Sequence, residues 1–168
     1  PAVPRWEDTR SSSGFNFRMM ELQGAVGLAQ LKKLPTIIEA QRENKSRLWD
    51  AISDLSEIEA RTVPEDSYET ADALVFLVEN KEKANRCRSE LLRIGISTKI
   101  LPEAYSWHFA GTWSHINELC SSHRQDLVNA FPRSNKILER AVSLPVGVKL
   151  DKDIPKKIRS ALSAALAL

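Results

Sequence analysis

The sequence lacks the features that mark several large classes of protein. Its 168 residues include only two cysteines, Cys87 and Cys120, so no disulfide framework is predicted. No apolar run reaches the roughly 18 residues that a membrane-spanning helix needs. The 24 basic and 22 acidic residues are interspersed, whereas nucleic-acid binders concentrate basic residues on one face. These absences argue against a disulfide scaffold, a membrane protein and a nucleic-acid binder, and they favour the reducing cytoplasm.

Sequence signatures of several enzyme classes are also missing. The chain has no dinucleotide-binding G-x-G-x-x-G, no P-loop, no G-x-S-x-G and no H-E-x-x-H. Three histidines and a cysteine fall within one short stretch, but their spacing matches no common zinc site, and we expect no metal there. They are His108, His115, Cys120 and His123.

Helical patterns dominate the first third and the end of the chain. Apolar residues at three-to-four-residue spacing predict a helix over 19–34 and a second one from Pro35 to about Asp54, because proline is tolerated only in the first turn. The polar segment 39–45 is expected to be solvated. A last helix, capped by an aspartate, is predicted to bury a stripe formed by Ile154, Ile158, Leu162, Ala165 and Leu166.

Between these helices the patterns alternate between strand and helix. Short strands are predicted at 58–61, 73–78, 96–100 and 141–146, and the apolar run 73–78 suggests coverage on both faces. Pro145 places the last strand at an edge or end of its sheet. Helices are expected at 81–94, with Asn80 as cap and Gly95 as stop, and at 119–130. The sequence thus predicts an α/β fold with a small sheet covered by helices.

Two segments carry unusual side chains. Residues 101–123 are rich in aromatics and histidines, and His108 lies between Trp107 and Phe109. Contact with a small polar ligand and simple anchoring of a loop are equally good interpretations of this stretch. Asn16 and Arg18 precede the first helix, where they could bind an anion, although a helix cap and a surface ion pair are the simpler interpretation of the residues alone.

A longer string around these residues is distinctive. Residues 14–31 read GFNFRMMELQGAVGLAQL, which closely resembles the signature that follows the catalytic half of the DegT/DnrJ/StrS family of pyridoxal-phosphate (PLP) sugar aminotransferases. LLRIGIST at 91–98, SLPV at 143–146 and the closing amphipathic helix are similar to the same family. The stretch 107–115 is most similar to the branch that aminates octulosonate (Kdo-type) sugars in lipopolysaccharide synthesis.

The resemblance implies an architecture and partners. It implies the α+β small domain of a fold-type I PLP-dependent transferase that works as a cytoplasmic homodimer with shared active sites. Residues 1–18 would form an interface loop from an upstream catalytic domain, 19–55 the connecting helices and 56–168 the small domain. The reaction would move an amino group from an amino acid, with glutamate as the expected donor, to a keto- or aldehyde-sugar.

The resemblance also assigns roles to residues. Asn16 and Arg18 would bind the phosphate of PLP, which reverses the simpler interpretation given above. Sugar contacts are expected from Tyr105, Trp107, His108 and His115. The lysine that carries PLP as a Schiff base is expected upstream, so the chain alone would be inactive. A PLP-dependent sugar dehydratase of the same family and a non-catalytic dimerisation module stay open as alternatives.

Overall fold

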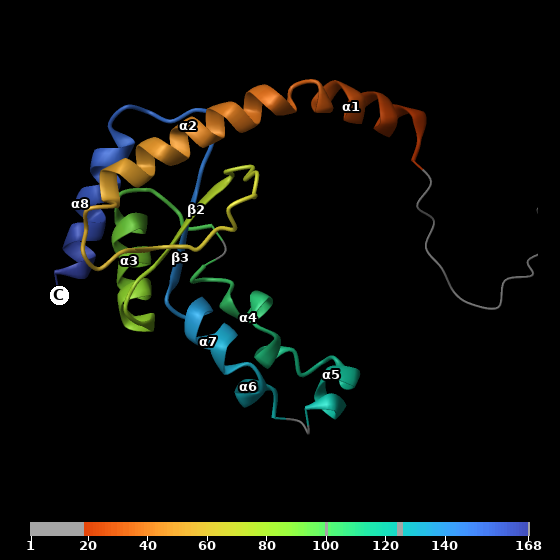
Figure 1. Ribbon diagram of the computed structural model, residues 1–168, viewed down its shortest axis with the longest axis vertical. Coiled ribbons are helices and arrows are strands. Elements are labelled where there is room, and N and C mark those ends of the chain that lie inside the picture. The colour runs from red at the N-terminus through yellow and green to blue at the C-terminus, as the bar shows by residue number, and fades with distance from the viewer. Residues whose placement is uncertain (1–18, 100, 124–125, 168) are drawn as a thin grey trace, which may run out of the picture. The chain divides into compact units, whose positions relative to one another are not determined.

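The computed structural model describes residues 19–99, 101–123 and 126–167. The chain divides into two compact units, Pro1–Pro35 and Thr36–Leu168, and each is described by itself. Within the described residues, no helix combines the length and the apolar character needed to cross a membrane. Figure 1 labels the helices and strands of both units.

The first unit contains helix α1, Glu21–Leu31. Its start is capped by the side chain of Gln23, whose Oε1 accepts a hydrogen bond from the backbone N–H of Met20 at 2.9 Å. The predicted phosphate ligands Asn16 and Arg18 lie outside the described residues. None of the side chains of α1 is buried, although the helix is rich in apolar residues.

Helix α2, Leu34–Ile52, starts with Pro35 in its first turn, as predicted. Leu48 and Ile52 are buried on its inner face. The expectation that 39–45 is solvated is wrong at Asn44, which is buried with 6% of its surface exposed. Asn44 stands four residues before Leu48, so a 3.6-residue helix places the two side chains on the same face.

Buried Asn44 ties α2 to the segment that precedes the last helix. Its Nδ2 donates to the carbonyls of Gly147 and Val148, both at 3.0 Å, and its Oδ1 accepts from Arg47 at 3.0 Å. Gln41, one turn earlier, donates to the carbonyl of Val146 at 3.0 Å. The buried amide therefore has its polar atoms satisfied, and it fixes α2 to the exposed backbone at Gly147 and Val148.

The sheet has three antiparallel strands in the order β1-β2-β3. The strands are β1 (Glu59–Ala60), β2 (Ala73–Leu77) and β3 (Ala141–Pro145). Ala73 pairs with Pro145 and Leu77 with Ala141, so Pro145 ends an edge strand, as predicted. Side chains alternate between the two faces of a strand. The prediction that β2 is covered on both faces is only partly right, because Ala73 and Val75 stay half-exposed.

Helix α3, Lys81–Arg93, follows β2 with both predicted signals in place. The side chain of Asn80 accepts from the N–H of Lys83 at 2.9 Å, and Gly95 adopts a φ of +79° beyond the end of the helix. Glycine reaches this left-handed conformation without the steric cost that a Cβ imposes. The local sequence therefore fixes both ends of α3.

The strand predicted over 96–100 is absent from residues 96–99. The backbone instead runs irregularly along β3: the N–H of Lys99 donates to the carbonyl of Ser143 at 2.6 Å, and the N–H of Ser143 donates to the carbonyl of Leu101 at 3.2 Å. Pro102 has no N–H to continue a ladder of hydrogen bonds. The apolar pattern of 96–100 indicates a segment of the sheet region, and the backbone at Lys99 does lie beside β3, but the strand conformation predicted for it is wrong.

The main core lies between one face of the sheet and three helices. Helix α8, Ile154–Leu166, contacts α3, and the two lie side by side in Figure 1. Four residues of the predicted α8 stripe are buried and Ile154 is half-buried. The α/β class with two long leading helices and a small helix-covered sheet is confirmed. The largest fully buried side chains of this core are Leu48, Ile52, Phe76, Val78, Cys87, Leu91, Val142, Leu144 and Leu162.

Short helices fill the stretch between α3 and β3. The single helix predicted over 119–130 is wrong: Asp126 is not helical, and its side chain caps a new helix by accepting from Asn129 N. The sequence analysis does not predict the helix that starts at Pro132, because proline commonly ends a helix, although it is also favoured in a first turn. The elements are α4 (Tyr105–His108), η1 (Ala110–Thr112), α5 (Asn117–Ser122), α6 (Leu127–Ala130) and α7 (Pro132–Leu138).

Replacing Asn44 with alanine should destabilise the second unit. The change removes the two hydrogen bonds that the buried amide donates to the carbonyls of Gly147 and Val148, which should lower the free energy of unfolding by about 1–3 kcal/mol. Urea unfolding followed by circular dichroism measures it. Glu43→Ala, at the exposed neighbouring position, is the control and should change stability by less than about 0.5 kcal/mol. Equal effects of both variants would contradict the role of the amide.

Candidate functional site

Residues 101–123, the aromatic segment, are anchored by a buried ring that packs on a glycine. Phe109 is only 2% exposed, and a Cβ added at Gly111 would lie 2.2 Å from the ring of Phe109 and 3.0 Å from the carbonyl oxygen of Leu127. The contact with the ring leaves no room for a methyl group, and the contact with the carbonyl would be tight, so glycine is what allows η1 to approach the buried ring this closely. This packing holds the segment in one place.

A carboxylate fixes the start of the segment. Glu103 accepts a hydrogen bond from the hydroxyl of Thr98, and its Oε1 lies 3.0 Å from Arg88 Nε on α3, an ion pair outside hydrogen-bond geometry. Burial pushes the pKa of Glu103 upward, but the hydrogen bonds from Thr98 and its own backbone, together with the nearby charge of Arg88, outweigh burial and hold the pKa below its ordinary value. Glu103 is therefore a charged link between α3 and the segment.

Tyr105 forms a third anchor, toward α7. Its hydroxyl donates to Oδ1 of Asn135, and its ring lies 5.2 Å from the ring of Phe109. Burial first, and then the negative charge of Glu139, raise the pKa of Tyr105, so the phenol stays neutral. A hydroxyl that already donates within the chain has less capacity left for a ligand.

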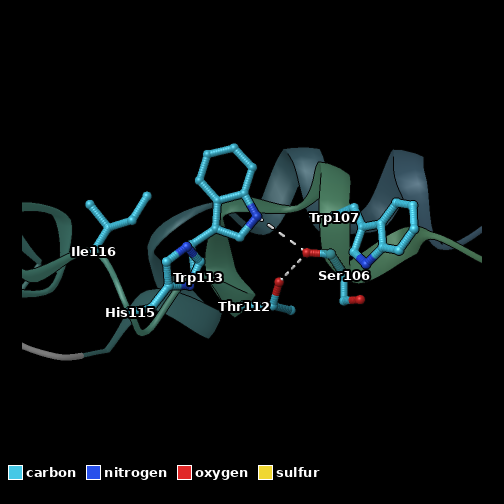
Figure 2. Close-up of a pocket in the computed structure, with 6 residues that line it drawn as sticks. All are labelled: Ser106, Trp107, Thr112, Trp113, His115 and Ile116. Carbon is cyan, nitrogen blue, oxygen red and sulfur yellow. Dashed lines mark hydrogen bonds between the residues drawn. The ribbon is translucent and has the colours of Figure 1, made fainter.

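A surface hollow of about 490 Å³ opens beside these anchors. It is formed around the carbonyl of Ser106, which accepts from the Thr112 hydroxyl at 2.6 Å and from Trp113 Nε1 at 3.2 Å. Figure 2 shows the indoles of Trp107 and Trp113 on opposite sides of this carbonyl. The lining residues are Ser106, Trp107, Thr112, Trp113, His115 and Ile116.

The structure separates the four predicted sugar contacts. Trp107 and His115 line the hollow, and Trp107 is 77% exposed, a high value for so large an apolar side chain. Tyr105 turns toward α7, and exposed His108 is not among the described lining residues. Sequence reasoning did not name Trp113 as a lining residue, although two tryptophans within seven residues were a usable signal.

The chemistry of the hollow suits a neutral ligand. Two indoles and Ile116 offer apolar faces, while hydroxyls and an imidazole offer a few polar contacts, which is the usual composition of a small-molecule site. No lysine or arginine belongs to the described lining, so these residues do not fit the phosphate of a cofactor. They fit a polyhydroxyl ring, which combines apolar C–H faces with hydroxyl groups.

The histidines and the cysteine of this region stand in separate contacts. His123 packs edge-on against Phe131, with ring centroids 4.9 Å apart, and the thiol of Cys120 donates to the carbonyl of Ser114 at 3.4 Å. Across residues 19–99, 101–123 and 126–167, no three histidine, cysteine or acidic side chains gather as metal ligands would.

These elements define a class: an α/β domain whose small antiparallel sheet carries an aromatic hollow on an inserted helical segment. The chain belongs to the DegT/DnrJ/EryC1/StrS aminotransferase family, whose model matches residues 3–163. Family membership agrees with the resemblance of the string 14–31.

Individual relatives are similar over parts of their length. A GDP-4-keto-6-deoxy-D-mannose 3-dehydratase of Yersinia pseudotuberculosis is 34% identical over 80 residues, 48% of this chain and 19% of the relative. The PseC aminotransferase of Helicobacter pylori shares the fold with a TM-score of 0.65 at 18% identity, over 99% of this chain and 42% of PseC. A GDP-4-keto-6-deoxy-D-mannose 3-dehydratase of E. coli, solved with bound hydrated PLP, shares the fold with a TM-score of 0.60 at 18% identity. The match covers 89% of this chain and 36% of the dehydratase. The chain thus spans less than half the length of these proteins.

Glu103 should make the stability of the domain depend on acid. Because its folded-state pKa lies below the ordinary value of 4.5, its contribution is present above that pH and is lost as pH falls through the lowered pKa. Glu103→Gln should therefore cost roughly 1 kcal/mol at pH 7 and progressively less below pH 4.5. Urea unfolding across this range measures the gap between wild type and variant.

Glu118→Gln, at an exposed position on α5, is the matched control and should leave stability unchanged across the same range. A gap for Glu103→Gln that stays constant down to pH 3 would show that the carboxylate charge is not what fixes the segment.

Proposed function

We propose that this chain is part of a PLP-dependent enzyme that moves an amino group from an amino acid, glutamate, to a keto- or aldehyde-sugar. The family match over residues 3–163 carries the proposal. The hollow supports it, because its two indoles, hydroxyls and imidazole suit a sugar ring. In this proposal the product serves cell-surface polysaccharide or lipopolysaccharide synthesis in the cytoplasm.

In this proposal, one group of residues binds the sugar and another binds the cofactor. Trp107 and His115, with Trp113, bind the sugar through apolar ring faces and polar edges. Asn16 and Arg18 bind the phosphate of PLP, because an amide N–H and a guanidinium supply the charge-assisted donors that a phosphate prefers and that the hollow lacks. Tyr105 and His108 act on the sugar side less directly, since the hydroxyl of Tyr105 is bonded to Asn135. Residues 1–18 form the interface loop, 19–55 the connecting helices and 56–168 the small domain.

Bound PLP supplies the electron sink that amino transfer requires. The lysine that holds it lies, in this proposal, outside the 168 residues. Among the described lysines, Lys45, Lys83 and Lys99 pair with carboxylates, and none lines the hollow. The chain alone is then inactive. The complete enzyme is a homodimer in which two copies share each active site.

A second candidate function is dehydration of a GDP-linked keto-sugar. The observation that favours it is the likeness to the GDP-4-keto-6-deoxy-D-mannose 3-dehydratase of Yersinia pseudotuberculosis, at 34% identity over 80 residues. Both reactions need PLP and a keto-sugar, so the hollow and the phosphate ligands suit either one. The two differ in whether the sugar gains an amino group or loses a hydroxyl.

Product analysis separates the two functions. The complete gene product, loaded with PLP, is incubated with glutamate and a panel of keto-sugar nucleotides, including GDP-4-keto-6-deoxy-D-mannose. We expect an amino sugar and an equal amount of 2-oxoglutarate by mass spectrometry. A deoxy sugar would favour the dehydratase instead. A protein that takes up no PLP, as judged by its absorption spectrum, would overturn both.

Replacing Trp107 with alanine tests the sugar-binding role of the hollow. The change removes an exposed indole face that binds the sugar equally in the ground state and the transition state, so KM for the sugar should rise about tenfold while kcat changes little. Steady-state kinetics of the complete enzyme measure both constants. Tyr68→Ala removes an aromatic side chain of similar exposure that is not part of the hollow, and it should leave both constants unchanged. Equal kinetics for wild type and Trp107→Ala would place the sugar elsewhere.

A further inference from the structure

The carbonyl of Ser106 accepts two hydrogen bonds from side chains at the hollow. The hydroxyl of Thr112 donates to it at 2.6 Å and Nε1 of Trp113 at 3.2 Å, and Figure 2 shows both donors turned toward this oxygen. The last four carbonyls of an α-helix have no partner within the helix, and α4 is only four residues long. Thr112 and Trp113 therefore supply hydrogen bonds that α4 cannot make for itself.

The hydroxyl of Thr112 links α4 to η1 and is not needed to form η1. It also lies 2.8 Å from the carbonyl of Phe109, but that carbonyl already accepts from the backbone N–H of Thr112 at 3.0 Å. The backbone N–H of Trp113 donates to the carbonyl of Ala110 at 3.1 Å. The turn that carries Trp113 thus keeps its backbone hydrogen bonds without the hydroxyl, and the link from Thr112 to α4 is what the hydroxyl adds.

The bond from Trp113 depends on this link. At 3.2 Å it lies near the upper end of the usual N–H···O range, and solvent reaches it, so water can compete for both groups. The bond from Thr112 holds the carbonyl of Ser106 beside the residue that precedes Trp113, where the indole meets its acceptor in a fixed position. Without the hydroxyl, α4 and η1 can separate and Nε1 can exchange the carbonyl for water.

A fixed indole has a definite role in the hollow. The side chain of Trp113 has a single N–H, and because this group is bonded within the chain, the indole offers a ligand its apolar ring. Hydrogen bonds to a ligand are left to lining groups such as the hydroxyl of Ser106 and the imidazole of His115. A side chain that is ordered before binding loses less conformational freedom when the ligand arrives, which favours binding.

We propose that Thr112 is a positioning residue of the sugar site, which acts through the carbonyl of Ser106 to hold the indole of Trp113 ready to stack on a sugar ring. The nature of the ligand rests on the proposed function. The contacts belong to this chain, so the order that they impose can be measured without PLP and without turnover.

Solvent exchange of the indole N–H of Trp113 tests the positioning in the 168-residue chain. Thr112→Val keeps the shape of the side chain and removes its hydroxyl, so this N–H should exchange about fivefold faster than in wild type. Thr112→Ser keeps a hydroxyl and should restore the wild-type rate. Nuclear magnetic resonance of the isotope-labelled chain measures the rate, and Trp113→Phe assigns the resonance. Thr62→Val, at an exposed position outside the hollow, is the control and should change nothing.

Sugar binding is tested with methyl α-D-mannopyranoside, a neutral sugar ring without a nucleotide. Thr112→Val should raise its dissociation constant about fivefold, and Thr112→Ser should restore it. The indole resonance of Trp107, which also lines the hollow, reports binding in every variant. In a Trp113→Phe chain, Thr112→Val should add little further weakening, because the effects of two residues that act together are not additive.

Kinetics of the complete enzyme separate positioning from chemistry. With glutamate and GDP-4-keto-6-deoxy-D-mannose, Thr112→Val should raise KM for the sugar about fivefold and leave kcat close to that of wild type. Either product, an amino sugar or a deoxy sugar, gives both constants.

Four results would overturn the inference. The first is an unchanged exchange rate of the Trp113 N–H in Thr112→Val, and the second is a Thr112→Ser chain that behaves like Thr112→Val. The third is equal weakening of mannoside binding by Thr112→Val with and without the indole of Trp113. The fourth is a wild-type chain whose Trp107 resonance does not move up to the solubility limit of the mannoside. A complete enzyme without turnover would instead contradict the proposed function, and the exchange and mannoside results would still decide the role of Thr112.

Discussion

The buried amide of Asn44 is the contact on which the arrangement of the second unit depends. A sheet of three short strands cannot bury its own apolar face, so α2, α3 and α8 must close over it. The connection from β3 to α8 runs along α2, and its carbonyls at 146–148 accept hydrogen bonds from Gln41 and Asn44. These bonds fix α2 to the connection in the position in which Leu48 and Ile52 reach the core. An apolar residue at position 44 would lose the bonds to Gly147 and Val148.

The aromatic segment shows how a site can be held without regular strands. Its helices are only three to seven residues long and contribute little rigidity of their own. Order comes instead from three anchors: Glu103 toward α3, Tyr105 toward α7, and Phe109 over Gly111. They leave the indoles of Trp107 and Trp113 beside the hollow. The neutral lining of the hollow contains no lysine or arginine among the described residues, so it does not suit a phosphate.

Much of the fold could be predicted because its signals are local. Pro35, Asn80 and Gly95 act on the residues beside them, and the structure places all three as their chemistry requires. The failures have a different origin. Buried Asn44 lies in a polar run that looks solvated, and only distant carbonyls explain it. The backbone near Lys99 follows β3 because of tertiary hydrogen bonds, not because of its own pattern. In the candidate site, the tryptophan–histidine cluster was visible in the sequence, whereas the turn of Tyr105 toward Asn135 depends on a partner 30 residues away.

The irregular backbone beside β3 has a consequence for behaviour at high concentration. An open sheet edge offers unpaired N–H and C=O groups to any strand of a neighbouring molecule, and this is a common route to aggregation. Here Ser143 accepts from the N–H of Lys99 and donates to the carbonyl of Leu101, which occupies its outer side, and the opposite edge, β1, is only two residues long. Neither edge of the sheet therefore offers a long row of free backbone groups to a strand of another molecule. The segment that protects β3 has no regular strand structure of its own.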